Sequence, residues 1–275
     1  MKPDCEHCHG TGFEIVARDG REFAVACACR RRESGSEDDF YASCRIPPRY
    51  EHCSLANFEP YSPVHRNALE KAMRYCSGYP FLGESEGLGL LFTGSNGTGK
   101  THLAVAVMRE LVLNKGVSAQ FWDFHELMRE IRKAYDPEIR LTEFQVLAPI
   151  IEMDVLLLDD LGAWKITDWM NDTLFHILNK RYLARRASII TTNFFDVPAA
   201  EAREAGDSFK REFLVERIGE RLRSRLTEMC LHVPVHGEDF RQRQQIANRN
   251  VVLGTSADTA DPVTPRRPKP FFGGE

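Results

Sequence analysis

The sequence predicts an α/β fold in which a small β-hairpin module precedes a P-loop domain with a five-stranded parallel sheet. Three observations carry this prediction. Paired cysteines flank a hairpin-like stretch near the N-terminus, strand-like and helix-like segments alternate from residue 63 to residue 245, and a glycine-rich loop joins the first strand to its helix. We divide the 275 residues into a module (1–33), a linker and extended segment (34–62), a P-loop domain (63–245) and a disordered C-terminal tail (246–275).

The predicted sheet has five strands, each an apolar run bounded by polar or turn residues, at 89–93, 118–123, 155–160, 188–193 and 231–235. Helical patterns separate them in LAVAVMRELVLNK, FHELMREIRKAY, DWMNDTLFHILNKRYLARR and REFLVERIGERLRSRL. The tail contains DPVTPRRPKP and FFGGE, and such a composition cannot build a core.

Composition favours an ordinary globular protein, with 43% hydrophobic and 28% charged residues. The formal net charge is −4, so contact with nucleic acid would need a local basic patch. No apolar run is long enough to span a bilayer, and MKPDCEHC lacks the apolar core of a secretory signal. We therefore expect a cytoplasmic protein, and in that compartment paired cysteines favour metal binding over disulfides.

The segment GSNGTGKT (94–101) fits G-x-x-x-x-G-K-[ST], with an apolar strand before it and a helix after it. Its glycines would let backbone N–H groups turn around phosphate oxygens at the helix N-terminus; a glycine-rich turn without ligand is the alternative. We expect Lys100 to contact the β- and γ-phosphates and Thr101 to offer its hydroxyl to Mg²⁺. The predicted nucleotide-binding residues are Gly94, Ser95, Asn96, Gly97, Thr98, Gly99, Lys100, Thr101 and His102.

Two later strands end in polar residues that suit ATP hydrolysis. VLLLDD places Asp159 where a second Mg²⁺ ligand is needed, and Asp160 where a carboxylate could polarise the attacking water; capping the next helix is the alternative. SIITTN places Asn193 near the γ-phosphate as a sensor, unless it is a plain turn residue. A GTPase is disfavoured because NKRY lacks the aspartate that reads guanine, and nothing marks the substrate lid of a small-molecule kinase.

The helix VERIGERLRSRL carries Arg217, Arg221 and Arg225 on one face, at intervals of four residues. For most of these arginines a solvated, salt-bridged helix is the simpler interpretation. If the protein assembles in a ring or spiral, however, one of them could reach the γ-phosphate of a neighbouring subunit.

These segments resemble bacterial replicative helicase loaders of the DnaC/DnaI type, AAA+ ATPases related to the initiator DnaA and the transposition helper IstB. The resemblance covers most of residues 44–245 and rests on RIPPRY, GSNGTGKTHLAVA, LLLDDLGAW, NKRYLARRASIITTN and GERLRSRL. It implies an AAA+ P-loop NTPase domain that hydrolyses ATP with Mg²⁺. The catalytic residues that it implies are Lys100, Asp159, Asp160, Asn193 and Arg225, the last as a finger acting in trans. It also suggests Arg241 in GEDFRQR as a second sensor.

In this clade a helical element after the second strand contacts single-stranded DNA. Here that element contains Arg129, Arg132, Lys133 and Tyr135, which could neutralise phosphates and stack on bases. Interleaved glutamates make an ordinary charged helix an equal alternative. Trp164 and Lys165 offer another contact point, although for Trp164 we favour a role as a packing anchor.

Cys5-x₂-Cys8 and Cys27-x-Cys29 provide four thiolates, a suitable tetrahedral set for Zn²⁺. The intervening GTGFEIVARDGREFAVA predicts a hairpin that turns at Asp-Gly and brings the pairs together. A redox pair and inert thiols are the alternatives, and a ligand could be replaced by His7, His9, Cys44 or Cys53. We predict a structural zinc that supplies the folding energy of the module.

DnaI-type loaders carry an N-terminal zinc module that grips the helicase, so the resemblance implies the same role for residues 1–33; DNA contact through Arg30, Arg31 and Arg32 is the second choice. The predicted function is ATP-dependent loading or remodelling of a hexameric replicative helicase on DNA. Single-stranded DNA and further copies of the chain are the other expected partners, and no membrane is expected. The alternatives are an IstB-like helper that selects target DNA for transposition and a nucleotide-gated DNA-binding adaptor.

Overall fold

The computed structural model describes residues 13–18, 21–26, 43–82, 85–86, 88–133, 143–164, 166–196 and 213–241. The chain divides into two compact units, of which the first ends at Glu238, and all the helices and strands below belong to the first. The predicted zinc ligands Cys5, Cys8, Cys27 and Cys29 and the predicted tail lie outside the described residues. None of the helices within these ranges is long and apolar enough to cross a membrane.

A five-stranded parallel sheet has the strand order β6-β7-β8-β5-β9. Its strands are β5 (Gly89–Thr93), β6 (Ala119–Asp123), β7 (Val155–Asp159), β8 (Ala187–Thr192) and β9 (Cys230–Pro234). β5, β7 and β8 are buried along their whole length, because both faces of the sheet are covered. The predicted sheet is confirmed, with each strand boundary within one residue of its expected place.

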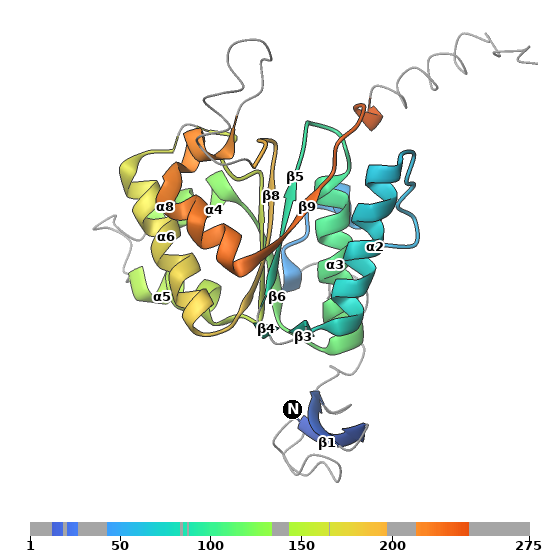
Figure 1. Cartoon of the computed structure of the whole chain (residues 1–275). Helices are drawn as coiled ribbons and strands as arrows, with labels where there is room; N and C mark the ends of the chain where they lie inside the picture. Colours follow the sequence, from blue (N-terminus) through green and yellow to red (C-terminus); the bar gives the residue numbers. More distant parts are fainter. Residues whose placement is uncertain are drawn as a thin grey trace, which may run out of the picture. The chain divides into compact units, whose positions relative to one another are not determined.

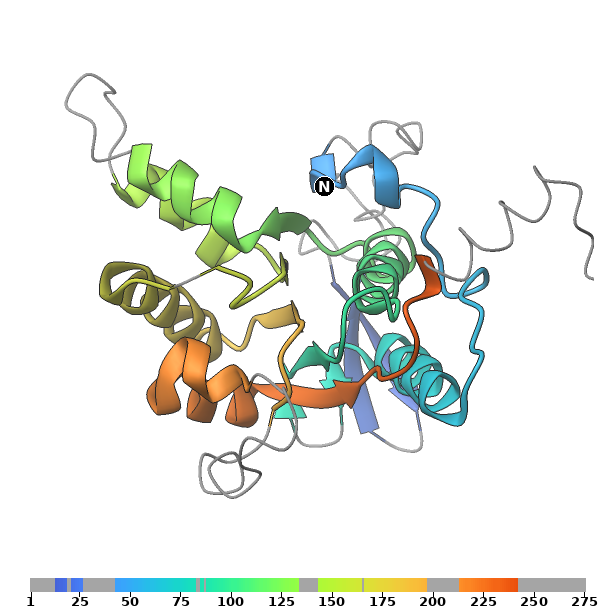
Figure 2. The same ribbon diagram turned by 90° about the horizontal axis from the view of Figure 1, so that it is seen from above.

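Helices cover both faces of the sheet (Figures 1 and 2). On one face lie α2 (Pro63–Gly78) and α3 (Lys100–Lys115); on the other lie α4 (Phe124–Lys133), α5 (Glu143–Glu152), α6 (Asp168–Leu183) and α8 (Leu214–Met229). The sequence pattern predicts α3, α4, α6 and α8, whereas α2 and α5 fall outside the predicted helical segments. α8 is kinked at Gly219, whose φ of 76° and ψ of 163° are not helical.

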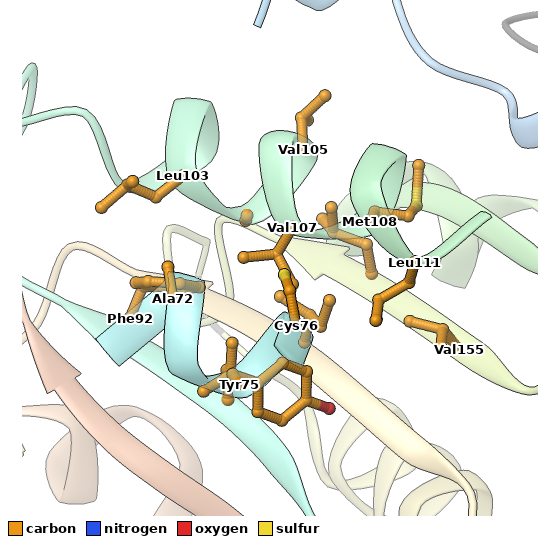
Figure 3. Packing of buried hydrophobic residues seen from close by; sticks show 14 of the residues in the cluster. Ala72, Tyr75, Cys76, Phe92, Leu103, Val105, Val107, Met108, Leu111 and Val155 are labelled. Carbon is orange, nitrogen blue, oxygen red and sulfur yellow. The ribbon is translucent and has the colours of Figure 1, made fainter. Parts of the chain in front are cut away.

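Each face of the sheet has its own hydrophobic core. Figure 3 shows the core beneath α2 and α3, where Ala72, Tyr75 and Cys76 of α2 face Leu103 and Val107 of α3. The second core joins the other sheet face to α4, α5, α6 and α8. Because the sheet is packed on both faces, the carboxyl ends of its strands are held in fixed positions relative to one another.

The buried guanidinium of Arg181, on α6, ties the start of two strands together. Its side chain is completely inaccessible to solvent. It donates to the carbonyl oxygens of Ile150 and Met153, both at 2.8 Å, around the end of α5. Further bonds reach the Ala187 carbonyl and, at 3.1 Å, the Ser188 hydroxyl at the start of β8. A planar group with five N–H donors can satisfy helix-end carbonyls and a strand at once.

The segment before α2 packs against the α2–α3 core instead of running free of it. It contains the short helix η2 (Pro48–Tyr50), and Cys44, Ile46, Cys53 and Phe58 are buried in that core. Cys76 and Cys230 are also buried, as the sequence predicts.

Two short antiparallel ribbons complete the described elements. β1 (Phe13–Arg18) pairs with β2 (Arg21–Ala26) in a register that sets Arg18 opposite Arg21, so the predicted hairpin forms. β3 (Phe81–Leu82) pairs with β4 (Ser85–Glu86).

Candidate functional site

The loop between β5 and α3 has a backbone conformation that depends on its glycines. Gly94, Gly97 and Gly99 have φ values of 148°, 72° and 93°, which L side chains rarely adopt. Space is also lacking: a Cβ on Gly94 would lie 2.0 Å from the Val235 carbonyl oxygen, and one on Gly99 would lie 2.8 Å from the Phe58 ring. Such a turn at the start of a helix is the arrangement that binds phosphate groups.

Lys100 begins α3 and is nearly buried beneath this loop, with 5% of its surface exposed. Its Nζ donates to the Ser95 carbonyl oxygen at 2.7 Å, and the Thr98 hydroxyl donates to the same oxygen at 3.0 Å. Ser95 and Asn96 are exposed at the loop surface. The predicted phosphate-binding residues therefore form one compact loop, with the lysine ammonium group directed into it.

Asp159 closes β7 and lies beside the first turn of α3, with 5% of its surface exposed. Its Oδ1 accepts hydrogen bonds from the hydroxyls of Thr101 at 2.9 Å and Thr191 at 2.5 Å. Burial, together with the nearby charge of Asp160, raises the pKa of the Asp159 carboxyl to about 6, although the two hydroxyl bonds act in the opposite direction. A buried carboxylate next to a hydroxyl is a donor set that fits Mg²⁺, whose charge would favour the ionised form.

Asp160 and Asn193, which the sequence analysis assigns separate roles near the γ-phosphate, are brought together at the carboxyl ends of β7 and β8. The Asn193 side-chain amide donates to Asp160 Oδ1 at 2.9 Å. The Asp160 backbone N–H donates to the Thr191 hydroxyl at 3.0 Å, and Asp160 adopts the left-handed region with φ of 57°. This backbone turns the Asp160 side chain away from the strand direction and toward Asn193.

Thr191 is a site residue that the sequence argument does not single out. Its hydroxyl contacts both aspartates, so Thr101, Asp159, Thr191, Asp160 and Asn193 form one continuous hydrogen-bonded set. The sequence signal for Thr191 is the pair of threonines at the end of the strand SIITT. A buried hydroxyl needs a hydrogen-bond partner, so two adjacent threonines at a strand end indicate polar neighbours there.

Histidines support the P-loop from the side of the N-terminal segment. His65 is fully buried; its Nε2 contacts the Thr98 carbonyl oxygen at 3.1 Å and its Nδ1 contacts the Ser62 hydroxyl at 2.6 Å. Burial lowers the pKa of the His65 imidazole, so the neutral form is favoured beneath the loop. His102, predicted to bind nucleotide, instead turns its Nε2 toward the Ser54 carbonyl oxygen at 3.0 Å.

The end of β9 meets the same loop. The Val235 N–H donates to the Thr93 carbonyl oxygen at 2.7 Å, and the Ser95 hydroxyl donates to the Gly237 carbonyl oxygen at 3.3 Å. The Tyr61 hydroxyl donates to the carbonyl oxygen of Glu238, the last residue of the first unit.

Of the four arginines of α8, the three that the sequence analysis singles out each lie over an aromatic ring. The guanidinium carbon of Arg217 lies 4.7 Å from the ring centre of Phe194, that of Arg221 lies 3.8 Å from Phe175, and that of Arg225 lies 4.3 Å from Tyr182. Arg225 also pairs with Glu228 at 2.7 Å, and Arg223, on the same helix, pairs with Asp196 at 2.6 Å. Arg221 is exposed, so this helix combines a solvated face and ion pairs with contacts to aromatic rings.

Arg225 does not join the hydrogen-bonded set at the P-loop, because its recorded partners are on α6 and α8. Arg241 belongs to the short second unit, where its backbone N–H donates to Asp239 Oδ1 at 2.9 Å. Its role as a second sensor stays a prediction.

Trp164 is 59% exposed, so the interpretation of this residue as a packing anchor is wrong. Its indole stacks on His125, in the first turn of α4, with ring centres 4.9 Å apart. Arg129 and Arg132 are exposed on the same helix, and the guanidinium of Arg132 lies 5.2 Å from the ring centre of Trp169. Lys133 is also exposed and pairs with Glu130 at 2.6 Å. Tyr135 and Lys165 lie outside the described residues.

Comparison with known families identifies this arrangement. Residues 52–248 match the model of the family described as IstB-like ATP binding protein. The chain belongs to this family.

Curated proteins similar to this chain include a replicative helicase loader and a protein of a phage-like element. The chain is 26% identical over 186 residues to the replicative helicase loader DnaC of Escherichia coli strain K12, covering 66% of this chain and 73% of DnaC. It is 24% identical over 235 residues to the phage-like element PBSX protein XkdC of Bacillus subtilis, covering 82% of this chain and 79% of XkdC.

Solved structures share the fold. The crystal structure of the DnaC helicase loader superposes with a TM-score of 0.57 and 29% identity, covering 69% of this chain and 99% of that one. The crystal structure of DnaI gives a TM-score of 0.51 at 23% identity, covering 70% of this chain and 93% of that one. The AAA+ P-loop fold and the relation to DnaC/DnaI-type loaders, both predicted from the sequence, are confirmed.

Proposed function

We propose that the protein binds ATP with Mg²⁺ at the P-loop and uses ATP hydrolysis to load or remodel a hexameric replicative helicase on DNA. The observation that carries this proposal is the continuous hydrogen-bonded set from Thr101 through Asp159, Thr191 and Asp160 to Asn193 beside the P-loop. The relation to DnaC, a protein named as a replicative helicase loader, supplies the cellular role.

Each residue of the site has a chemical task in this proposal. Thr101 and Asp159 would hold Mg²⁺, which would neutralise phosphate charge. Lys100 would exchange its contact with the Ser95 carbonyl for phosphate oxygens, since both are acceptors for the same ammonium group. Asp160 would orient the attacking water and accept its proton, while the amide of Asn193 holds that carboxylate in place.

Steady-state ATP turnover tests the enzymatic part of the proposal. Lys100→Ala should abolish nucleotide binding and turnover, and Asp160→Asn should keep binding but lower turnover by about 100-fold or more. Asp172→Asn, on the exposed side of α6, is the matched carboxylate control and should behave like the wild type. Turnover in the wild type that Lys100→Ala does not change would refute an ATPase centred on this loop.

We propose that Arg225 acts on the nucleotide of a neighbouring subunit in a ring or spiral. Two observations support this role: Arg225 has no partner in its own site, and its Nε is buried without a hydrogen-bond acceptor. On reaching a neighbouring nucleotide, the guanidinium would exchange its contacts with Tyr182 and Glu228 for a charge-assisted contact with phosphate.

We further propose that single-stranded DNA contacts the exposed surface formed by Trp164, His125, Arg129 and Arg132, here called the α4 surface. An exposed indole and exposed guanidinium groups would bind bases and phosphates without sequence preference. Trp164→Ala and Arg129→Ala should each weaken binding of a fluorescent oligonucleotide, and Arg129→Ala should also reduce its salt dependence. Loss of binding in neither variant would exclude this surface.

The partner is decided by affinity capture with the full chain as bait. Enrichment of a hexameric helicase that is lost with Cys5→Ser/Cys8→Ser would support loading through the predicted zinc module. Enrichment of a transposase would instead support an IstB-like helper, and binding to DNA alone would support the adaptor.

A further inference from the structure

A cluster of soft metal ligands lies next to the P-loop and outside the hydrogen-bonded set that runs from Thr101 to Asn193. One ring nitrogen each of His52 and His102 and the Sγ of Cys53 all lie within 4.8 Å of one another. His52 and Cys53 follow η2, whereas His102 lies in the first turn of α3. Among the described residues this is the one group of three or more histidine, cysteine or acidic side chains close enough to share an ion.

The surroundings of His102 fix its tautomer. Its Nε2 lies 3.0 Å from both the Ser54 carbonyl oxygen and Asn57 Oδ1. Asn57 Oδ1 also accepts from the Ser54 N–H at 2.9 Å, which identifies it as the amide oxygen. Both neighbours of Nε2 are therefore acceptors, so Nε2 carries the hydrogen and the lone pair of the neutral ring is on Nδ1. Metal-binding histidines typically have this arrangement, in which the second ring nitrogen donates to a carbonyl.

Cys53 is placed for a similar role. Its side chain is buried, with 2% of its surface exposed, and its backbone N–H donates to the Tyr50 carbonyl oxygen at 3.0 Å. Its Sγ lies 4.0 Å from Nε2 of His52. Because His52 is exposed, its imidazole can turn toward the thiol without disturbing the core.

We propose that His52, Cys53 and His102 bind a zinc ion. Two imidazole nitrogens and one thiolate are ligands that Zn²⁺ prefers and Mg²⁺ does not. Tetrahedral zinc would bring these atoms to separations of about 3.3–3.6 Å. Their present separations are all within 4.8 Å, and that between Cys53 Sγ and His52 Nε2 is 4.0 Å. Within the described chain no fourth ligand of this kind joins the group, so water completes the coordination, as in open zinc sites.

This zinc site would tie the segment before α2 to the first turn of the P-loop helix. His102 directly follows Thr101, the proposed Mg²⁺ ligand, so zinc would restrain the start of α3. The effect on nucleotide binding rests on the proposed function, whereas the presence of the metal does not.

The test is made in the full-length chain carrying Cys5→Ser and Cys8→Ser, which removes ligands predicted for the separate N-terminal site. The protein is loaded with ZnCl₂, dialysed and analysed for metal by mass spectrometry, and its melting temperature is measured with and without zinc. We expect about one zinc per chain and a higher melting temperature with zinc. A zinc-free background protein would overturn the proposal.

Point variants in this background identify the ligands. His52→Gln and Cys53→Ser should each lose the bound zinc and the zinc-dependent rise in melting temperature. The matched controls are His176→Gln, an exposed histidine on α6, and Cys76→Ser, a buried thiol of the same core; both should keep the metal. Zinc content in His52→Gln equal to that of the controls would refute the site even if Cys53→Ser does not fold. Because the readout is metal content, this result is independent of ATP turnover.

Discussion

Replacing Asp159 by asparagine should stabilise the nucleotide-free protein while disabling its chemistry. The Asp159 carboxyl is buried, and its pKa is raised from 3.8 to about 6. Below about pH 4 both the folded and the unfolded chain hold the proton, so the carboxyl contributes nothing to stability. Between these values the folded protein keeps the proton while the unfolded chain releases it, and the free energy of unfolding falls as the pH rises. Above pH 6 the full destabilisation is present.

The difference between 3.8 and about 6 corresponds to about 3 kcal/mol of unfolding free energy. Asp159→Asn removes the charge but keeps an oxygen for the Thr101 and Thr191 hydroxyls, so most of this should be recovered. For a domain of this size, we expect the melting temperature to rise by roughly 5–10 °C at pH 7.5. The same variant should lose Mg²⁺-dependent turnover, since it lacks the carboxylate that would hold the ion.

Thermal unfolding followed by circular dichroism, without nucleotide or Mg²⁺, measures this effect at pH 7.5 and at pH 4. The gain should vanish at pH 4, where Asp159 is protonated in the wild type, and Asp172→Asn should show no gain at either pH. A melting temperature at pH 7.5 equal to or below that of the wild type, in a variant with a normal spectrum, would refute the reasoning.

Three further changes probe other parts of the molecule. Arg181→Lys should lower the free energy of unfolding by about 3 kcal/mol, because an ammonium group cannot reach the strand and the helix-end carbonyls together; denaturant titration against Lys180→Ala measures this. Thr191→Val should reduce ATP turnover by roughly 10-fold with little change in nucleotide affinity, and an equal loss of both would show that it merely supports the fold. Arg225→Ala should bind ATP without turnover, and mixing it with Lys100→Ala subunits should restore activity; no recovery on mixing would contradict action in trans.

Local patterns were sufficient to predict most of the fold. A strand buried on both faces must be apolar along its length, so VLLLD reads as a central strand without knowledge of its neighbours. The P-loop is equally local, since the positive φ angles of Gly97 and Gly99 require glycine. Asp160 and Asn193 could be paired because parallel strands end at the same edge of the sheet.

The contacts that escaped prediction join distant segments. Nothing near Arg181 in the sequence indicates that its charge is buried among carbonyls of α5 and β8. An arginine at this spacing on a helix normally faces water. His65, within α2, and Phe58, before α2, likewise lie well before the P-loop in the sequence yet contact it directly. The solvent exposure of Trp164 could not be predicted from its neighbours in the sequence either, because it depends on where α4 packs.

The residues that follow β9 are hydrogen-bonded to the P-loop and to the segment before α2. Ser95 and Tyr61 grip the carbonyl oxygens of Gly237 and Glu238, the last two residues of the first unit. A Cβ atom at Gly237 would lie 2.6 Å from the His65 ring, so there is no space for a side chain at this position. A phosphate group that displaces the Ser95 hydroxyl would break its hydrogen bond to the Gly237 carbonyl oxygen, so the proposed nucleotide and the end of the first unit compete for the same side chain.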